Sequence, residues 1–427
     1  MILKVKPTDY LKGSIELPAS KSYSIRAFMI AMRGGNSRIT APSNCDDAKV
    51  SMAVAKKFGA KISFLNKNTW SVMASAGKCN FSQIDVKESG TVLRFLLPIL
   101  SLYRRKACVV GRGTLRGRPN YHLTHTLRKQ GVCIRGRGAK ECIPIQLKGG
   151  ELKGGKIEID GSLSSQFISA LLIACPELPE DSKILIKGDK VVSSDYILMT
   201  QQVLKRSGIR IKKVNNRLYQ IKGRQKFRGL KNFVVPSDYG LAAFALAAGA
   251  LCPSKITLKG FFDDRLLQAD GKILDFLRKL GVKYKRTSQA IQVQGPFIIK
   301  GGSFSLKDCP DLLPIMSVLA LFAKRKVRLF HIQHARLKES DRISDLRKEL
   351  LKIGARIIEK EDELIIHPLK FYKRGVLLDS HRDHRLAMAF FILGLKLGAR
   401  VKDIECVNKS YPGFVSDMRK LGAKVIK

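Results

Sequence analysis

The stretch "LPASKSYSIRAFMIAM", residues 17–32, gathers cations and hydroxyl groups in front of an apolar run. Lys21 stands where a helix is expected to begin, and Ser22 and Arg26, four residues apart, share one face of its first turns. Free backbone N–H groups, hydroxyl donors and two cations together suit a phosphate or a carboxylate. By itself the stretch also fits an ordinary serine-capped helix with solvated charges.

Five further stretches combine glycine, hydroxyls or charges with an expected helix start or loop. They are "ESGTVLRFLL" (88–97), "GRGTLRGRP" (111–119), "GSLSSQFISALLIA" (161–174), "ARLKESDRI" (335–343) and "DSHRDHRLAM" (379–388). Gly90 and Thr91 begin one expected helix, where an anion can approach the backbone closely. Ser164, Ser165 and Gln166 stand at the start of another.

The arginine-rich stretch follows the expected strand "ACVV" and brings Arg112, Arg116 and Arg118 into one loop. Its glycines do not match the G-x-G-x-x-G pattern, so a dinucleotide-binding fold is not indicated. Each of the six stretches alone is typical of a solvated helix cap. Together they indicate cations that hold anions, with a few carboxylates for proton transfer and no nucleophile–base pair.

Length and composition describe a globular protein of two or three domains. The chain has 427 residues, of which 45% are hydrophobic and 27% charged. Its longest apolar stretches, such as "LAAFALAAGAL" (241–251), are shorter than a membrane span, and "MILKVKPTDY" at the start is expected to form a first strand rather than a signal peptide. Nine cysteines without a C-x-x-C pair indicate neither a disulfide framework nor a zinc site, which favours a cytoplasmic location.

The formal net charge of +44 allows a nucleic-acid partner. However, the 79 basic residues are spread along the whole chain, and aromatic residues, at 7%, do not gather near the cationic motifs as base-stacking platforms would. We therefore expect no specific nucleic acid, and interpret the charge as a lysine bias or a solubility feature that also attracts anionic substrates.

One pattern recurs six times along the chain. It comprises "VAKKFGAKI", "TLRKQGVCI", "VLKRSGIRI", "FLRKLGVKY", "ELLKIGARI" and "DMRKLGAKV". Each is a helix end with basic residues, a glycine where a left-handed cap belongs, and a short β-run. The glycines are Gly59, Gly131, Gly208, Gly281, Gly354 and Gly422, at intervals of 68 to 77 residues. The sequence therefore predicts six copies of one α/β unit, three on each side of "FVVPSDYG" (233–240), and a ligand cleft between the two halves.

The whole chain resembles the 5-enolpyruvylshikimate-3-phosphate synthase family of enolpyruvyl transferases. The resemblance rests on stretches found in order: "LPASKSYSIRA", "ESGT", "RGRP", "SSQF", "SSDYI", "CPDLLP", "LKESDR", "DHRLAM" and "NKSYPGF". It implies an α/β fold of two lobes, each of three βαβαββ units, arranged as inside-out α/β barrels. The N-terminal lobe would span residues 20–234, mainly on the shikimate 3-phosphate side. Residues 1–19 with 235–427 would form the C-terminal lobe, so that the chain crosses a hinge near residues 19 and 235.

The resemblance implies transfer of the enolpyruvyl group of phosphoenolpyruvate to the 5-hydroxyl of shikimate 3-phosphate, with release of phosphate. The residues it implies for shikimate 3-phosphate are Lys21, Ser22, Arg26, Ser164, Ser165, Gln166, Ser193, Tyr196, Asp311, His334 and Lys338. Those implied for phosphoenolpyruvate are Lys21, Gly90, Thr91, Arg118, Gln166, Arg342, Arg385 and Lys409. Planar guanidinium groups bind carboxylate and phosphate oxygens in pairs, which suits these two substrates.

By the same resemblance Asp311 is the base for the hydroxyl, Glu339 is the acid for the methylene carbon, and Lys21 assists the departing phosphate. The residues alone also allow Asp311 to be the N-cap of the helix "LLPIMSVLALFA". The implied reaction needs no metal, cofactor or membrane, and we expect a monomer that glyphosate inhibits.

Several positions depart from the family pattern. Glu88 and His334 stand where many relatives have Asn, and an extra residue in "GDKVVSSDYI" leaves Ser193 and Ser194 as alternatives. The sister enzyme that acts on UDP-N-acetylglucosamine usually has a reactive cysteine in the arginine loop, where this chain has Thr114 and Leu115. That sister activity is the alternative within the fold. A scaffold without activity or an RNA-binding relative is the alternative outside it.

Overall fold

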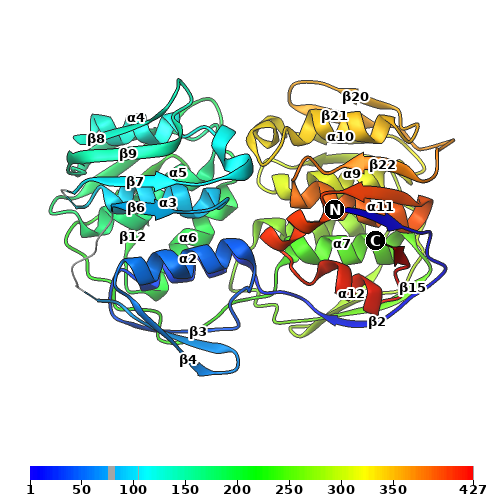
Figure 1. Cartoon of the computed structure of the whole chain (residues 1–427), viewed down its shortest axis with the longest axis horizontal. Coiled ribbons are helices and arrows are strands. Elements are labelled where there is room, and N and C mark those ends of the chain that lie inside the picture. The colour runs from blue at the N-terminus through cyan, green and yellow to red at the C-terminus, as the bar shows by residue number, and fades with distance from the viewer. Residues whose placement is uncertain (76–81, 104, 427) are drawn as a thin grey trace. The chain divides into compact units, whose positions relative to one another are not determined.

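The computed structural model describes residues 1–75, 82–103 and 105–426. The chain divides into two compact units (Figure 1). One comprises Ser20–Val235, and the other combines Met1–Ala19 with Pro236–Lys427. We refer to them below as the 20–235 unit and the 236–427 unit.

Within the described residues, six four-stranded sheets have the same design: two parallel strands followed by two antiparallel ones. Those of the 20–235 unit are β14-β3-β5-β4 (Phe233–Val234, Asn36–Thr40, Thr69–Met73, Lys61–Asn66), β6-β7-β9-β8 (Gln83–Asp85, Ala107–Val110, Cys142–Gly150, Val132–Arg137) and β10-β11-β13-β12 (Gly155–Asp160, Ser182–Lys187, Leu218–Ile221, Ile211–Lys213). Those of the 236–427 unit are β2-β15-β17-β16 (Leu11–Glu16, Ser254–Lys259, Ala290–Val293, Tyr284–Arg286), β18-β19-β21-β20 (Gly302–Ser305, Val327–Phe330, Glu363–Ile366, Ile357–Glu359) and β22-β23-β1-β24 (Val376–Asp379, Ala399–Lys402, Ile2–Val5, Val425–Ile426). The predicted sixfold α/β repeat is confirmed.

Some neighbouring strands of a sheet lie far apart in the sequence. β2 pairs in parallel with β15, and β14 pairs in parallel with β3, although almost the whole 20–235 unit separates the members of each pair. β1 pairs with both β23 and β24, so the N-terminal segment completes a sheet made from the end of the chain.

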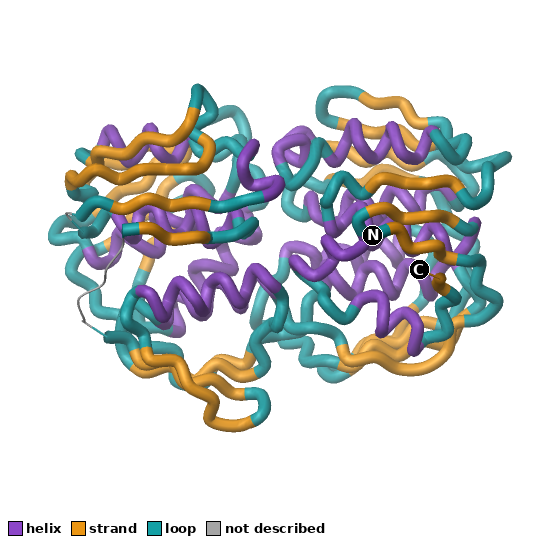
Figure 2. The backbone as a smooth tube through the Cα atoms, in the orientation of Figure 1, coloured by secondary structure: helices purple, strands orange, loops and turns teal. Residues whose placement is uncertain are grey.

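Six inner helices form the apolar interior of the units, with strands around them (Figure 2). They are α1 (Lys21–Ala31), α3 (Gly90–Leu100), α5 (Ser165–Ala174), α7 (Tyr239–Leu251), α9 (Leu313–Leu321) and α11 (His384–Leu397). Every residue of α7 and α9 is buried, which explains why these segments read as unbroken apolar runs. Each buried Leu, Ile or Phe stabilises the fold by about 1.5–3 kcal/mol, so the inner helices account for much of the stability.

Six outer helices alternate with the inner ones along the chain: α2 (Asp46–Lys57), α4 (Tyr121–Lys129), α6 (Ser194–Arg206), α8 (Lys272–Lys279), α10 (Arg342–Leu351) and α12 (Phe414–Lys420). Each is followed closely by one of the six repeat glycines, whose φ angles lie between +86° and +103°. Such angles favour glycine because they crowd a Cβ atom. The predicted left-handed caps are confirmed at all six positions.

The polar motifs of the sequence lie where helices begin or at short 3₁₀ helices between the longer elements. The 3₁₀ helices are η1 (Gly113–Gly117), η2 (Cys175–Glu177), η3 (Ala269–Gly271), η4 (Pro310–Leu312), η5 (Gln333–Leu337) and η6 (Ile404–Lys409). The arginine stretch is therefore not a plain loop as predicted, because η1 occupies its middle. No helix in the described ranges has the length and apolarity that crossing a membrane takes.

Candidate active site

The guanidinium of Arg342 joins three carboxylates in the 236–427 unit. Its Nη1 donates to Asp311 Oδ1 at 2.7 Å, its Nη2 to Glu339 Oε2 at 3.0 Å, and its Nε to Asp383 Oδ2 at 2.7 Å. The side chain is 1% exposed. Burial works against its charge, but the carboxylates of Asp383, Asp311 and Glu339 outweigh this and raise the pKa of Arg342 well above its ordinary value. The cation is thus fixed in charge and in position.

Asp311 lies in η4, directly before the buried helix α9. Besides Arg342 it accepts from Nη2 of Arg385 at 3.2 Å, and Nζ of Lys338 lies 4.0 Å from Oδ1. Burial alone would raise the pKa of Asp311, but Arg385, Arg342 and Lys338 lower it well below its ordinary value. Its carboxylate therefore stays ionised in the protein without substrate.

The alternative interpretation of Asp311 as the N-cap of α9 is wrong. Leu312 occupies the cap position of α9, and no side-chain oxygen caps this helix. Asp311 lies within the η4 turn, one residue before the cap position. Its two carboxylate oxygens accept from Arg342 and Arg385 instead. By contrast, Asp383 is the N-cap of α11 and accepts from the backbone N–H of Arg385 at 2.8 Å.

Glu339 lies between two cations of different segments. Arg342 contacts one of its oxygens, and Nζ of Lys409, in η6, lies 3.5 Å from the other.

Arg385, which contacts Asp311, donates in addition from Nη1 to the Gly240 carbonyl at 2.7 Å, and this bond fixes its guanidinium against the start of α7. The structure thus brings together six predicted site residues from four parts of the sequence: Asp311, Lys338, Glu339, Arg342, Arg385 and Lys409.

In the 20–235 unit, Lys21 is the first residue of α1, as predicted. Ser20 caps the helix by accepting from the Tyr23 backbone N–H at 3.4 Å. Nζ of Lys21 lies 3.3 Å from Oδ2 of Asp47, which is buried in the first turn of α2. Sequence reasoning missed Asp47, and the only signal was an acidic pair, Asp46 and Asp47, at a helix start.

Arg26 is a buried cation that donates only to neutral oxygens. Its Nε donates to Thr200 Oγ1 at 2.8 Å, its Nη1 to the Ser22 carbonyl at 2.9 Å, and its Nη2 to the Tyr196 carbonyl at 3.0 Å. Burial lowers the pKa of Arg26 to about 10, so it remains protonated at neutral pH. No carboxylate pairs with it within the described part of the chain. A buried guanidinium in this state is well suited to an anionic ligand.

Arg94 links the starts of α3 and α5. It donates to Gln166 Oε1 at 2.7 Å, and Gln166 in turn donates to Thr91 Oγ1 at 3.0 Å. Arg94 also donates to the Pro119 carbonyl at 3.1 Å, beside Arg118. The sequence analysis passed over Arg94, although one charged residue inside the apolar segment "TVLRFLL" was a usable signal.

Gly90 and Arg118 lie in close contact. A Cβ atom placed on Gly90 would lie 2.6 Å from Nη1 and 3.0 Å from Cζ of Arg118. The absence of a side chain at position 90 therefore allows the guanidinium to lie against the start of α3. Arg118 itself is almost fully buried.

The remaining predicted residues lie at helix starts or in a short 3₁₀ turn. Ser164 caps α5 by accepting from the Gln166 backbone N–H at 3.3 Å, and Ser165 is the first residue of that helix. Ser193 is buried before α6 with a φ of +56°, and Ser194 begins the helix. His334 is buried in η5. Glu88, one of the unusual positions, accepts from Thr114 Oγ1 at 3.4 Å and lies over Gly113.

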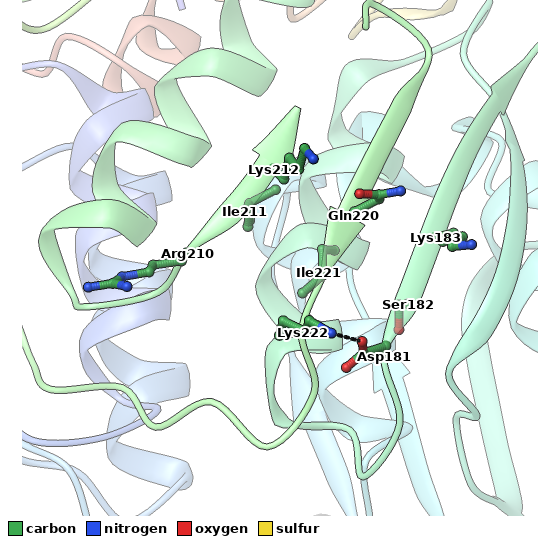
Figure 3. Close-up of a pocket in the computed structure, with 9 residues that line it drawn as sticks. All are labelled: Asp181, Ser182, Lys183, Arg210, Ile211, Lys212, Gln220, Ile221 and Lys222. Carbon is green, nitrogen blue, oxygen red and sulfur yellow. Dashed lines mark hydrogen bonds and ion pairs between the residues drawn. The ribbon is translucent and has the colours of Figure 1, made fainter. Parts of the chain in front are cut away.

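A separate open hollow of about 460 Å³ lies on the sheet β10-β11-β13-β12 (Figure 3). It is lined by Asp181, Ser182, Lys183, Arg210, Ile211, Lys212, Gln220, Ile221 and Lys222. Among these residues, Nζ of Lys222 donates to Oδ2 of Asp181 at 2.7 Å. None of these nine residues belongs to the predicted site. Among the described residues, no three His, Cys, Asp or Glu side chains are grouped so that they could hold a metal ion.

Comparison with known proteins shows which family the chain belongs to. The model of the family "EPSP synthase (3-phosphoshikimate 1-carboxyvinyltransferase)" matches residues 5–418. The chain belongs to the EPSP synthase family. Proteins called 3-phosphoshikimate 1-carboxyvinyltransferase from Methanococcus maripaludis and Methanocaldococcus jannaschii are each 35% identical to it over 99% of both chains.

Solved structures have the same fold. EPSP synthase from Acinetobacter baumannii covers 100% of both chains with a TM-score of 0.79 at 23% identity. The enolpyruvyl transferase NikO from Streptomyces tendae covers 100% of this chain and 98% of its own, with a TM-score of 0.80 at 17% identity. The expected EPSP synthase family and α/β fold class are confirmed.

Proposed function

We propose that this chain transfers the enolpyruvyl group of phosphoenolpyruvate to the 5-hydroxyl of shikimate 3-phosphate and releases phosphate. The observation that carries the proposal is the cluster in which Arg342 holds Asp311, Glu339 and Asp383. It combines an ionised carboxylate, a second carboxyl between two cations, and arginines suited to anionic substrates. Membership of the EPSP synthase family supports this reaction.

The addition step needs one proton removed and one supplied. Asp311 takes the proton of the 5-hydroxyl as the oxygen bonds to C2 of phosphoenolpyruvate. Glu339 gives its proton to C3, which becomes a methyl group. Both acidic side chains contact Arg342, so the base and the acid are held in a fixed relation to one guanidinium.

The elimination step reverses the second transfer. A proton leaves the methyl carbon to Glu339, the C2–C3 double bond reforms, and the bond from C2 to the phosphate oxygen breaks. The hydroxyl proton held by Asp311 leaves with phosphate, and Lys21 balances the charge of the departing group. The residues end in their starting protonation states, and no cofactor takes part in the scheme.

Arg342, Arg385 and Lys409 already have carboxylate partners before substrate arrives. Arg342 and Arg385 both contact Asp311, and this pairing holds the pKa of Asp311 low. We propose that the carboxylate and phosphate of phosphoenolpyruvate compete for Arg342, Arg385 and Lys409. Their arrival weakens the pull on Asp311 and makes it a stronger base. In this scheme, binding of phosphoenolpyruvate itself activates Asp311 as the base.

For the 20–235 unit we propose that the features around Arg26 and α5 bind shikimate 3-phosphate. The side chains proposed are Lys21, Ser22, Arg26, Ser164, Ser165, Gln166, Ser193 and Tyr196, with Asp311, His334 and Lys338 from the other unit. Gly90, Thr91 and Arg118 would contribute to phosphoenolpyruvate binding together with Gln166. Support comes from the buried state of Arg26 and the Thr91–Gln166 contact.

The test is a phosphate-release assay with phosphoenolpyruvate and either shikimate 3-phosphate or UDP-N-acetylglucosamine. The proposal expects release with the first acceptor and none above background with the second. The second candidate, the sister activity, predicts the reverse pattern, but where that enzyme usually has a cysteine this chain has Thr114 and Leu115, both in η1. We further propose a monomer in the cytoplasm, which size-exclusion chromatography and cell fractionation test.

A further inference from the structure

Lys338 and Glu339 lie in an irregular segment, residues 333–341, that precedes α10 and is called the loop below. Only Gln333–Leu337 forms a turn of 3₁₀ helix, and α10 begins at Arg342. Efficient proton transfer requires the reacting groups to be held in a narrow range of positions. Something other than regular backbone hydrogen bonding must therefore hold this segment in place.

Arg336 connects the loop to the start of α10. Its Nη1 donates to Asp341 Oδ2 at 3.1 Å and to Ser344 Oγ at 2.9 Å. Asp341 is also the N-cap of α10, accepting from the backbone N–H groups of Ile343 and Ser344 at 3.1 Å each. The same carboxylate thus fixes both Arg336 and the helix whose first residue is Arg342.

Arg336 also connects the loop to the β20–β21 hairpin, which lies beside α10 (Figure 1). Nη1 donates to Glu359 Oε1 at 2.9 Å, Nη2 to the Lys360 carbonyl at 2.9 Å, and Nε to the Glu361 carbonyl at 3.2 Å. Gln333 adds a second tie, because its backbone N–H donates to Asp362 Oδ1 at 2.6 Å. The turn between β20 and β21 is therefore attached to the loop at two points.

We infer that Arg336 is a positioning residue that holds Glu339 and Lys338 in register with Arg342, an inference that rests on the proposed function. Arg336 fixes the loop three residues before Glu339, and Asp341 fixes it two residues after. Between these anchors Glu339 reaches Arg342 and Lys409, and Lys338 reaches toward Asp311. Arg336 acts on the reaction only through these residues.

An arginine is required for this role because the acceptors surround a planar group. All three guanidinium nitrogens are used, toward two carboxylates, one hydroxyl and two carbonyls. A lysine carries a single nitrogen and can satisfy only part of this set. The ion pairs are partly shielded, since the Arg336 side chain is 23% exposed.

The chain offers a matched control that contacts the same hairpin from a neighbouring strand. Arg328, on β19, pairs through Nε with Glu363 Oε2 on β21. This pair is also an arginine–carboxylate contact to the hairpin. Arg328 is more exposed than Arg336, and neither it nor Glu363 belongs to the loop or to the proposed machinery.

The experiment compares wild type, Arg336→Met, Arg336→Lys and Arg328→Met in steady-state kinetics well below their melting temperatures. Active sites are counted by equilibrium binding of shikimate 3-phosphate. For Arg336→Met we expect kcat to fall about 10- to 100-fold while both KM values change less than about threefold. Arg336→Lys should recover part of kcat, and Arg328→Met should stay within about twofold of wild type.

Retention of kcat within about twofold in Arg336→Met would overturn the inference, as would an equal loss in Arg328→Met. If Arg336→Met does not fold, Glu359→Gln serves instead, since it removes one charge from the arrangement at nearly constant volume. It should lower kcat with unchanged KM, and an unchanged kcat would count against the inference. Absence of turnover in wild type would refute the proposed function rather than the role of Arg336.

Discussion

Nη1 of Arg342 and Oδ1 of Asp311 form an ion pair of 2.7 Å at the centre of the candidate site. Asp311 shares its other oxygen with Arg385, so the proposed base is held between two of the proposed anion-binding residues. The pair explains how a carboxylate with a lowered pKa can act as a base. Substrate anions that share the positive charge of the two arginines leave Asp311 with a higher proton affinity.

Asp311→Asn should lower kcat about 10²- to 10⁴-fold, because a positioned base contributes about that much. Affinity for shikimate 3-phosphate should change much less, since Asn keeps the shape and one acceptor oxygen. Stopped-flow or steady-state kinetics with isothermal titration of the substrate measures the two effects separately. Turnover close to that of wild type would remove Asp311 from the base role.

The lowered pKa of Asp311 should also affect how the free energy of unfolding depends on pH. The pKa of Asp311 is lowered in the folded protein, so its carboxylate stabilises the fold fully above the ordinary value of 3.8. That stabilisation is lost as pH falls below 3.8 through the lowered folded-state pKa. Urea unfolding at pH 7, 4 and 3 should therefore show the difference in unfolding free energy between wild type and Asp311→Asn narrowing at pH 3. A difference that stays constant across this range contradicts the lowered pKa.

Asp383→Asn tests the fixed position of Arg342. Asp383 is fully buried and accepts from Nε of Arg342 at 2.7 Å, and loss of one charge from such a pair costs about 3–5 kcal/mol. Unfolding free energy should fall by about that amount, and KM for phosphoenolpyruvate should rise as Arg342 loosens. Asp275→Asn, which breaks the exposed pair with Arg278, is the control and should change neither quantity appreciably. Equal stability of the two variants would argue against a buried ion pair.

Gly90→Ala should act through Arg118. The added Cβ would lie 2.6 Å from Nη1, so the guanidinium must move. We expect weaker binding of phosphoenolpyruvate and a larger loss for glyphosate, the inhibitor expected from the family resemblance, because it is longer than the reacting part of the substrate. Gly117→Ala is the matched control, as a Cβ there meets nothing within 4 Å. Competition assays that give an unchanged ratio of inhibitor to substrate affinity would exclude this steric explanation.

Local signals in the sequence were sufficient for the repeat and for the helix starts. Gly59 and its five counterparts follow outer helices with positive φ angles, and Lys21, Gly90 and Ser165 begin helices as predicted. These features depend on a few neighbouring residues, which is why composition and spacing could indicate them.

Partners distant in the sequence could not be predicted in the same way. Arg94 and Gln166 are 72 residues apart, and Arg342 and Asp383 are 41 apart, yet each pair is in hydrogen-bond contact. The wrong cap assignment of Asp311 has the same origin. Its local context, just before an apolar helix, favoured a cap, whereas two distant arginines determine where its carboxylate points.

The most direct test of the account follows deuterium at C3 of phosphoenolpyruvate. With shikimate 3-phosphate in D₂O, protonation by Glu339 places deuterium on the methylene carbon, and elimination retains part of it in the product. NMR should show deuterium there for wild type, and Glu339→Gln should slow its appearance about 10²- to 10⁴-fold together with turnover. Incorporation at the wild-type rate in Glu339→Gln would contradict the assignment of proton transfer to the carboxylates around Arg342.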